Sequence, residues 1–173
     1  MDRLWASWRM AYIEGASAVP SGEEACIFCE LPNAGNDREA MLVARRPSVF
    51  AVLNIYPYNV GHTMVAPYAH ASSIEELDSR VRGALMELCG EVVAALRRAY
   101  SPDGFNLGMN LGRVAGAGFP GHLHMHIVPR WSGDTNFMPV VADTKVLPED
   151  LRTTYEKLTA ALGDLEQNPT KSR

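Results

Sequence analysis

The segment HLHMHIV, residues 122–128, constrains the fold of this chain more than any other stretch of its sequence. Its first six residues alternate strictly between histidine and apolar side chains: His122, Leu123, His124, Met125, His126 and Ile127. Because successive side chains of a β-strand point to opposite faces, the alternation predicts a strand with its apolar side chains in the core. The three imidazoles then lie in a row on the other face. Exposed strand faces ordinarily carry Thr, Lys, Glu or Ser, so this row indicates a functional site.

Three histidines could bind one metal ion, but their spacing along a strand argues against it. Neighbouring side chains on one face of a strand are about 6.5–7 Å apart. The first and the third, His122 and His126, are therefore too far apart for each to bond the same metal at about 2 Å. We expect the three histidines to have different roles.

The rest of the chain predicts a mixture of strands and helices. Short apolar runs bounded by turn residues predict strands at 40–45, 49–55, 62–67, 105–111 and 122–130. Apolar residues three and four positions apart predict a helix over 74–100, and Pro148 followed by two acids predicts the start of a final helix that ends near residue 165. These elements predict an α+β fold, with a mainly antiparallel sheet, one long helix and a C-terminal helix.

Length and composition predict one domain over residues 1–173. Within its N-terminal segment, residues 1–40, the composition of 14–40 predicts irregular structure around two cysteines. Residues 167–173 form a polar tail that we expect to be disordered.

Charge and apolar patterning exclude several classes of protein. A net charge of −4 argues against a protein that coats nucleic acid. No apolar run reaches the roughly 18 residues that cross a bilayer, so we expect no membrane partner. The opening residues lack the uninterrupted apolar stretch of a signal peptide. With three cysteines and no such signal, we expect a cytoplasmic protein without a disulfide framework.

A second candidate site begins with the pair Cys26 and Cys29 in the motif CIFC. Such a pair alone is compatible with a zinc knuckle, a redox pair or buried thiols. His70 and His122 could complete a set of two sulfur and two nitrogen ligands, a composition typical of structural zinc. The third cysteine, Cys89, falls on the apolar side of the predicted long helix, and we interpret it as a core residue.

The triad segment resembles the signature of the histidine triad family, in which three histidines alternate with apolar residues. Further segments resemble the same family: LNIYPYNVGHTMVAPYAH (53–70), GFNLGMNLG (104–112) and VPRWSGDTNF (128–137). The opening LWASWRMAYI (4–13) resembles the diadenosine tetraphosphate phosphorylase-like branch of that family. The resemblance implies a histidine-triad fold and nucleotidyl transfer through a covalent histidine.

In that family the middle histidine of the triad is the nucleophile, which implies this role for His124. The chemistry agrees, because a neutral imidazole has one unprotonated nitrogen at cytoplasmic pH and can split one displacement into two easier steps. His126 can then hydrogen-bond the phosphate or the leaving-group oxygen, a contribution of about 10²–10⁴-fold.

The resemblance also implies a set of nucleotide-binding residues: Asn54, Asn110, Gly116, Ala117, Gly118, His124 and His126. Asn54 matches a ribose-binding position and Asn110 a phosphate-binding one, although either could simply cap a turn. The loop 112–121 is rich in glycine, so its backbone N–H groups can approach phosphate oxygens, although it could also be a flexible link. Many relatives carry a Ser, Thr or Gln in this loop, whereas Arg113 is its only polar side chain here.

By the same resemblance we assign Cys26, Cys29, His70 and His122 to a zinc ion. A closed set of four ligands leaves no position for substrate, so this zinc would be structural. The resemblance further implies a homodimer and phosphorolysis of diadenosine tetraphosphate to ATP and ADP. The alternatives are a hydrolase of nucleoside phosphoramidates or dinucleoside polyphosphates, and a non-catalytic regulatory protein that binds purine nucleotides.

Overall fold

A computed structural model describes residues 26–134 and 147–167 of the chain. Its five strands are β1 (Leu42–Arg45), β2 (Val49–Leu53), β3 (Thr63–Pro67), β4 (Gly104–Met109) and β5 (Met125–Arg130). Its α-helices are α2 (Ile27–Glu30), α3 (Ser79–Tyr100) and α5 (Leu151–Gln167), and short 3₁₀ turns lie at Leu31–Asn33, Ile74–Glu76 and Arg113–Ala115. The predicted α+β class is confirmed. The opening segment 4–13 and the tail 168–173 lie outside the described residues.

The strands form one antiparallel sheet in the order β1-β2-β3-β5-β4. Register places Val52 beside Met64, Met64 beside His126, and His126 beside Gly108. This row runs from β2 to β4, so His126 stands near the middle of the sheet on the same face as its neighbours in the row. β4 is an edge strand with mostly exposed or half-buried side chains.

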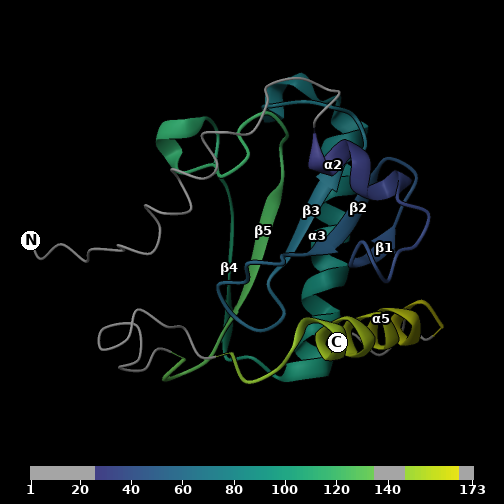
Figure 1. The fold of residues 1–173 in the computed structure, drawn as a ribbon, viewed down its shortest axis with the longest axis vertical. Coiled ribbons are helices and arrows are strands. Elements are labelled where there is room, and N and C mark those ends of the chain that lie inside the picture. The colour runs from purple at the N-terminus through teal and green to yellow at the C-terminus, as the bar shows by residue number, and fades with distance from the viewer. Residues whose placement is uncertain (1–25, 135–146, 168–173) are drawn as a thin grey trace, which may run out of the picture.

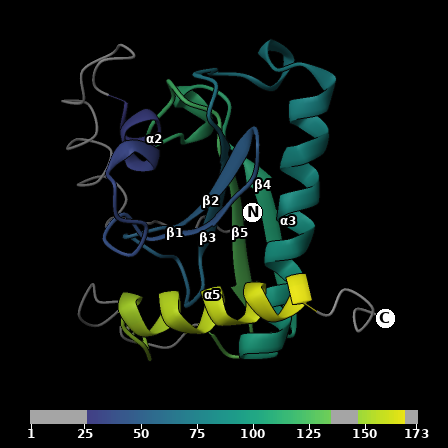
Figure 2. The same cartoon turned by 90° about the vertical axis from the view of Figure 1, so that its right-hand side faces the viewer.

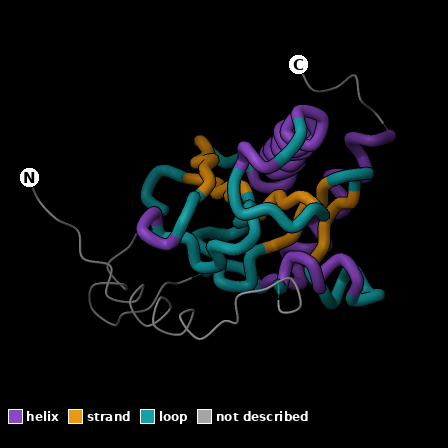
Figure 3. The backbone as a smooth tube through the Cα atoms, turned by 90° about the horizontal axis from the view of Figure 1, so that it is seen from above, coloured by secondary structure: helices purple, strands orange, loops and turns teal. Residues whose placement is uncertain are grey.

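Helices cover both faces of the sheet around β2 (Figure 2). On one face, α3 and α5 pack over a core that includes Ala51, Val65 and Ile127. On the other face, the short helix α2 covers a smaller cluster that includes Phe28 and Phe50. Seen from above, the strands lie between α3 and α2 (Figure 3). Every residue of β2 is consequently buried.

The two long helices begin later than predicted, because an aspartate caps each one. The carboxylate of Asp78 accepts hydrogen bonds from the N–H groups of Arg80 and Val81, so α3 begins at Ser79 and residues 74–76 form a separate turn. Asp150 accepts in the same way from the backbone of the first turn of α5. Pro148 therefore precedes this helix and does not begin it. The helix extends to Gln167, the first residue of the predicted tail.

Residues 14–40 were expected to be irregular, and the described part of this range corrects that expectation. Residues 27–33 form α2 and a 3₁₀ turn (Figure 1). Two backbone N–H groups, those of Cys29 and Glu30, donate to the carbonyl of Cys26 at 3.0 Å. Burial of Phe28 on the sheet stabilises this single turn, which is too short to be stable by itself. None of the helices in the described ranges has the length and apolarity to cross a membrane.

Candidate active site and metal centre

The triad segment is a strand only in its second half, because β5 begins at Met125 and not at the predicted residue 122. Upstream, the N–H of Leu123 donates to the carbonyl of Ala71 at 2.6 Å, outside the sheet. The predicted separation of faces is still observed. Leu123, Met125 and Ile127 are buried, while the rings of His122 and His124 both contact Phe28 on the other face.

Cys26, Cys29, His70 and His122, which we call the Cys/His cluster, come together as predicted, with their ligand atoms all within 4.8 Å of one another. The Sγ of Cys26 lies 3.3 Å from Nδ1 of His122. The Sγ of Cys29 lies 3.4 Å from Nδ1 of His70 and 3.6 Å from Nδ1 of His122. In a zinc tetrahedron with ordinary bond lengths, sulfur and nitrogen ligands are about 3.5 Å apart. The four side chains therefore fit a tetrahedral metal ion.

The state of His122 also suits a metal ligand. Its Nε2 lies 2.9 Å from the carbonyl oxygen of Pro67. A carbonyl oxygen only accepts, so Nε2 carries the proton and Nδ1 presents its lone pair to the two sulfurs. Burial, the largest cause, lowers the pKa of His122 to about 4, which keeps the ring neutral.

Phe28 connects the Cys/His cluster to the next histidine of the triad. It stands between the two cysteines in the sequence, and its ring stacks on that of His124 with centroids 4.6 Å apart. It also contacts the ring of His122 at 5.3 Å and that of Phe119, from the glycine-rich loop, at 6.0 Å. One fully buried side chain therefore packs against parts of both candidate sites.

His124 is held in one tautomer by its own backbone. Its Nδ1 lies 2.8 Å from the carbonyl oxygen of His122, so Nδ1 carries the proton. Burial lowers the pKa of His124, which favours the neutral ring. Nε2 of His124 then has a lone pair and can act as a nucleophile.

His126 is oriented by a fourth histidine, His62, which the sequence analysis did not select. The backbone N–H of Tyr58 donates to Nδ1 of His62 at 3.0 Å, so the proton of the neutral ring is on Nε2. That nitrogen lies 2.9 Å from Nδ1 of His126 and donates to it. His126 therefore carries its own proton on Nε2 and can donate it to an oxygen. The rings of His124 and His126 lie 4.9 Å apart, which brings an acceptor-type and a donor-type imidazole together.

A sequence signal for His62 was present. It is a histidine at the start of an apolar strand, directly after Gly61, and it is almost fully buried. Gly61 has a φ of +75°, and a Cβ there would lie 2.7 Å from Cδ2 of Leu96. Side chains other than glycine rarely adopt this φ, and a Cβ here would also force the core side chain of Leu96 to shift. In the sequence, the only trace of this position is a histidine directly after a glycine and before an apolar run, whereas its burial and its contact with His126 are visible in the structure alone.

The predicted nucleotide-binding residues are only partly brought together. Oδ1 of Asn54 accepts from the N–H of Tyr56 at 2.9 Å, a turn-forming contact. Its Nδ2 lies 3.4 Å from Nδ1 of His62, which places it beside the histidines. Asn110 donates to the carbonyl of Gly116 at 3.1 Å and thereby ties the end of β4 to the glycine-rich loop. Gly116 has a φ of 87°, whereas no positive φ is found at Gly118, and Ala117 and Gly118 are half-buried.

An open cleft of about 380 Å³ adjoins His126 on the same face of β4 and β5, and we call it the β5 cleft. Its lining includes Asn110 and Tyr58 near His126 and Asn106 and Arg130 at the other end. The predicted loop residues Gly116, Ala117 and Gly118 are not part of its lining. The cleft and the paired histidines together form a concave polar site, the ordinary setting for a small ligand.

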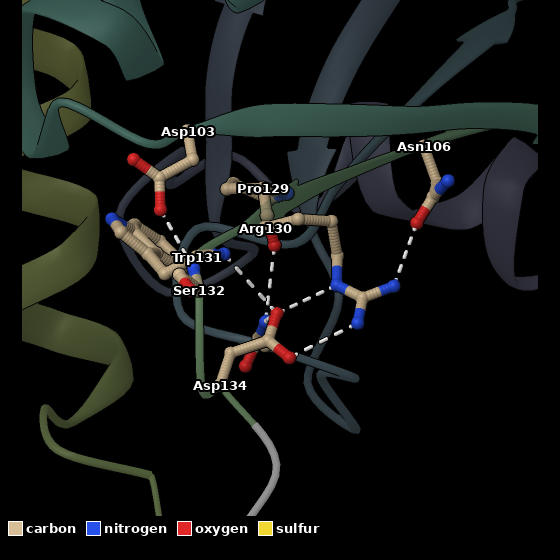
Figure 4. Close-up of polar contacts among 8 residues, drawn as sticks. Asp103, Asn106, Pro129, Arg130, Trp131, Ser132 and Asp134 are labelled. Carbon is tan, nitrogen blue, oxygen red and sulfur yellow. Dashed lines mark hydrogen bonds and ion pairs between the residues drawn. The ribbon is translucent and has the colours of Figure 1, made fainter.

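The far end of the cleft is fixed by Asp134 (Figure 4). Its carboxylate accepts from Nε of Arg130 at 2.6 Å, from Nη2 of Arg130 at 3.0 Å and from Nδ2 of Asn59 at 2.8 Å. Nη1 of Arg130 donates to Oδ1 of Asn106 at 2.8 Å. The hydrogen bond from Arg130 is the main reason that the pKa of Asp134 lies well below its usual range. The guanidinium is consequently held between two strands and a loop.

Known proteins resemble this chain in sequence and in fold. The chain is 41% identical over 162 residues to the "AP-4-A phosphorylase" of Mycobacterium tuberculosis, covering 91% of this chain and 83% of that protein. A hypothetical histidine triad nucleotide-binding protein from Sulfolobus tokodaii matches the structure with a TM-score of 0.69 at 27% identity, over 86% of this chain and 99% of that one. A zinc-bound histidine triad family protein from Mycobacterium smegmatis has the same fold, with a TM-score of 0.68 at 24% identity over 84% of this chain and 99% of that one.

The model of the HIT domain family matches residues 36–133, more than half of the chain. This range holds all five strands of the sheet and all the histidines described above. Together with the identity to the mycobacterial enzyme, the match shows that the chain belongs to the HIT domain family.

Proposed function

We propose that the protein is a nucleotidyltransferase that converts diadenosine tetraphosphate and inorganic phosphate to ATP and ADP. One observation carries the proposal: two adjacent imidazoles are held in opposite tautomers, so that Nε2 of His124 has a lone pair and Nε2 of His126 has a proton. The 41% identity to the mycobacterial AP-4-A phosphorylase supports the choice of substrate.

In the first step, Nε2 of His124 forms a bond to the α-phosphorus of diadenosine tetraphosphate. The bond from that phosphorus to its bridging oxygen breaks, and the oxygen keeps the electron pair and leaves as part of ATP. The Nε2–H of His126 hydrogen-bonds this oxygen while its negative charge develops. Because Nδ1 of His124 keeps its proton and its hydrogen bond to the carbonyl of His122, the product is an adenylylated imidazolium.

In the second step, a deprotonated oxygen of inorganic phosphate bonds to the same phosphorus. The phosphorus–nitrogen bond breaks, its electron pair returns to Nε2 of His124, and ADP is released. An adenylylated imidazolium releases neutral imidazole, a good leaving group, so both displacements are easier than direct attack of phosphate on the substrate. Asn54 and Asn110, with the backbone of 116–118, are the proposed contacts of the first nucleotide.

Isotope tracing tests the reaction directly. The protein is incubated with diadenosine tetraphosphate and radiolabelled inorganic phosphate, and the nucleotides are separated. The label is expected in the terminal phosphate of ADP and not in ATP. AMP and ATP formed without incorporation of label would identify a hydrolase. Tight nucleotide binding without turnover in the wild-type protein, with the same affinity in His124→Asn, would favour a regulatory nucleotide-binding protein.

We further propose that the Cys/His cluster holds one structural zinc ion. The sulfur–nitrogen distances match a tetrahedron, and the proton on Nε2 of His122 leaves Nδ1 for the metal. Bound there, zinc would tie α2 to the segment that precedes His124. Elemental analysis of the purified protein should give one zinc per chain, and a metal-free native protein would contradict the assignment.

A cytoplasmic homodimer completes the proposal. Among the strands of the described residues, β4 lies at the edge of the sheet, and this edge can extend the sheet into a second copy of the chain. None of the three cysteines forms a disulfide, as is usual in a reducing compartment. Light scattering after gel filtration should give twice the mass of one chain of 19.0 kDa. A single-chain mass at micromolar concentration would contradict the dimer.

A further inference from the structure

We propose that the β5 cleft binds the second nucleoside of the substrate, the one that leaves with the triphosphate, and that Asn106 and Arg130 recognise it. This inference rests on the proposed function, since it assigns the part of a dinucleoside polyphosphate that the triad does not bind. The cleft adjoins His126 directly, so a group that departs past that histidine enters it.

Distance along the strand supports this occupant. His126 and Arg130 are both in β5, four residues apart and on the same face. At about 3.3 Å per residue, their positions are about 13 Å apart. Register places Asn106 beside Val128, which lies midway between His126 and Arg130 along the strand. A triphosphate that begins at His126 therefore spans most of the interval and brings its nucleoside to Asn106 and Arg130.

The charge of the cleft favours a nucleoside over a bare phosphate chain at this end. Arg130 is paired with Asp134, so the two formal charges cancel. The neighbouring groups are the neutral amides of Asn106 and Asn59 and the apolar side chain of Val128. The volume of about 380 Å³ lies within the range of small-ligand sites.

The guanidinium can still donate to a ligand. Of its five N–H groups, three are used by Asp134 and Asn106 among the described residues. Its side chain is 47% exposed, whereas that of Asp134 is 9% exposed. Arg130 is thus held rigidly by a buried carboxylate and presents its remaining donors to the cleft, together with the amide of Asn106. Such a rigid pair suits the hydroxyl and carbonyl oxygens of a nucleoside.

Calorimetric binding to a turnover-deficient protein tests the inference. In the His124→Asn background, diadenosine tetraphosphate should fill both sites, whereas AMP should fill the first one only. Asn106→Asp replaces the side-chain amide that would contact the nucleoside with a carboxylate that cannot donate a hydrogen bond. We expect this change to weaken binding of diadenosine tetraphosphate by about tenfold or more and to leave AMP affinity within about twofold.

Two further variants complete the design. Arg130→Lys keeps the charge but loses the planar fork, and we expect the same selective loss. Gln167→Glu, an equivalent amide-to-carboxylate change at the exposed end of α5, should alter neither affinity. Equal losses for both ligands, or no loss for diadenosine tetraphosphate, would overturn the inference. Failure of the proposed function would look different: the wild-type protein would bind diadenosine tetraphosphate selectively through Asn106 but not convert it.

Discussion

The two ends of the triad use the same residue type for different chemistry. His122, at the buried end, belongs to the Cys/His cluster, whereas His124 and His126 lie side by side at the end next to the open β5 cleft. The difference lies in which ring nitrogen donates a hydrogen bond to a backbone carbonyl. In His122, Nε2 donates to the carbonyl of Pro67, and Nδ1 faces the cysteines. In His124, Nδ1 donates to the carbonyl of His122, and Nε2 is available to a substrate. Backbone acceptors therefore select a ligand or a nucleophile from identical side chains.

The largest effect on turnover is expected from a change at the end of the triad that lies next to the β5 cleft. His124→Asn removes the nucleophile while keeping a side chain of similar polarity, and we expect turnover of diadenosine tetraphosphate to fall by about 10³-fold or more. Steady-state kinetics with product separation measure the loss. The variant should retain the wild-type melting temperature within a few degrees. Activity above a tenth of wild type would assign the nucleophile elsewhere.

A change at the buried end of the triad should reduce the stability of the protein more than its catalytic rate. Cys26→Ser removes one ligand of the Cys/His cluster, and we expect the bound metal to be lost and the free energy of unfolding to fall by roughly 3 kcal/mol. Urea denaturation with metal analysis measures both quantities. Cys89→Ser changes a cysteine outside the cluster and should keep the metal. A Cys26→Ser protein with a full metal content would show that the four side chains do not form one site.

The fourth histidine should have an intermediate effect on rate. His62→Phe retains a ring beneath Tyr58 but removes the hydrogen bond to Nδ1 of His126, so we expect a loss of about 10–100-fold. The loss should be greater for adenosine 5′-phosphoramidate, whose amine leaving group needs a proton, than for diadenosine tetraphosphate. Rates for the two substrates are compared in the variant and the wild type. Equal losses would indicate a structural role for His62 and not one in proton placement.

Phe28 should show the smallest effect, because it links the two ends only by packing. Phe28→Leu keeps an apolar side chain but removes the stack on His124, worth about 0.5–1.5 kcal/mol. We expect a few-fold decrease in turnover at an unchanged metal content. The neighbouring Ile27→Leu, on an exposed position of α2, serves as the control. A Phe28→Leu protein that loses its metal would show that the two ends are coupled more tightly than packing alone explains.

Local patterns predicted the sheet well, since alternation and turns depend on nearby residues. The strands ending at Arg45 and Pro67 and the burial of Ile127 followed from period-two patterns. The residues at which helices and strands begin were less predictable. α3 begins after Asp78 because a side-chain cap outweighs the apolar spacing upstream, and β5 begins at Met125 because the residues before it bond elsewhere.

The candidate site was predictable where residue type and the family resemblance together limit the chemistry. The cysteine pair alone left three interpretations open, the resemblance added His70 and His122 as partners, and the structure brings the four together. His62 could not be found in this way, because its importance comes from a contact with a residue 64 positions away. The β5 cleft was equally hidden, since it depends on the register of β4 against β5 and on the pairing of Arg130 with Asp134.

The core thiol of Cys89 is an internal reporter of how often the folded structure opens. It is 1% exposed in α3, and burial raises its pKa to about 12. A thiolate is needed for alkylation, so Cys89 should react only when the core opens, whereas Cys26 and Cys29 should react as soon as their cluster opens. The two labelling phases would then time local and global opening separately in the same unmodified chain.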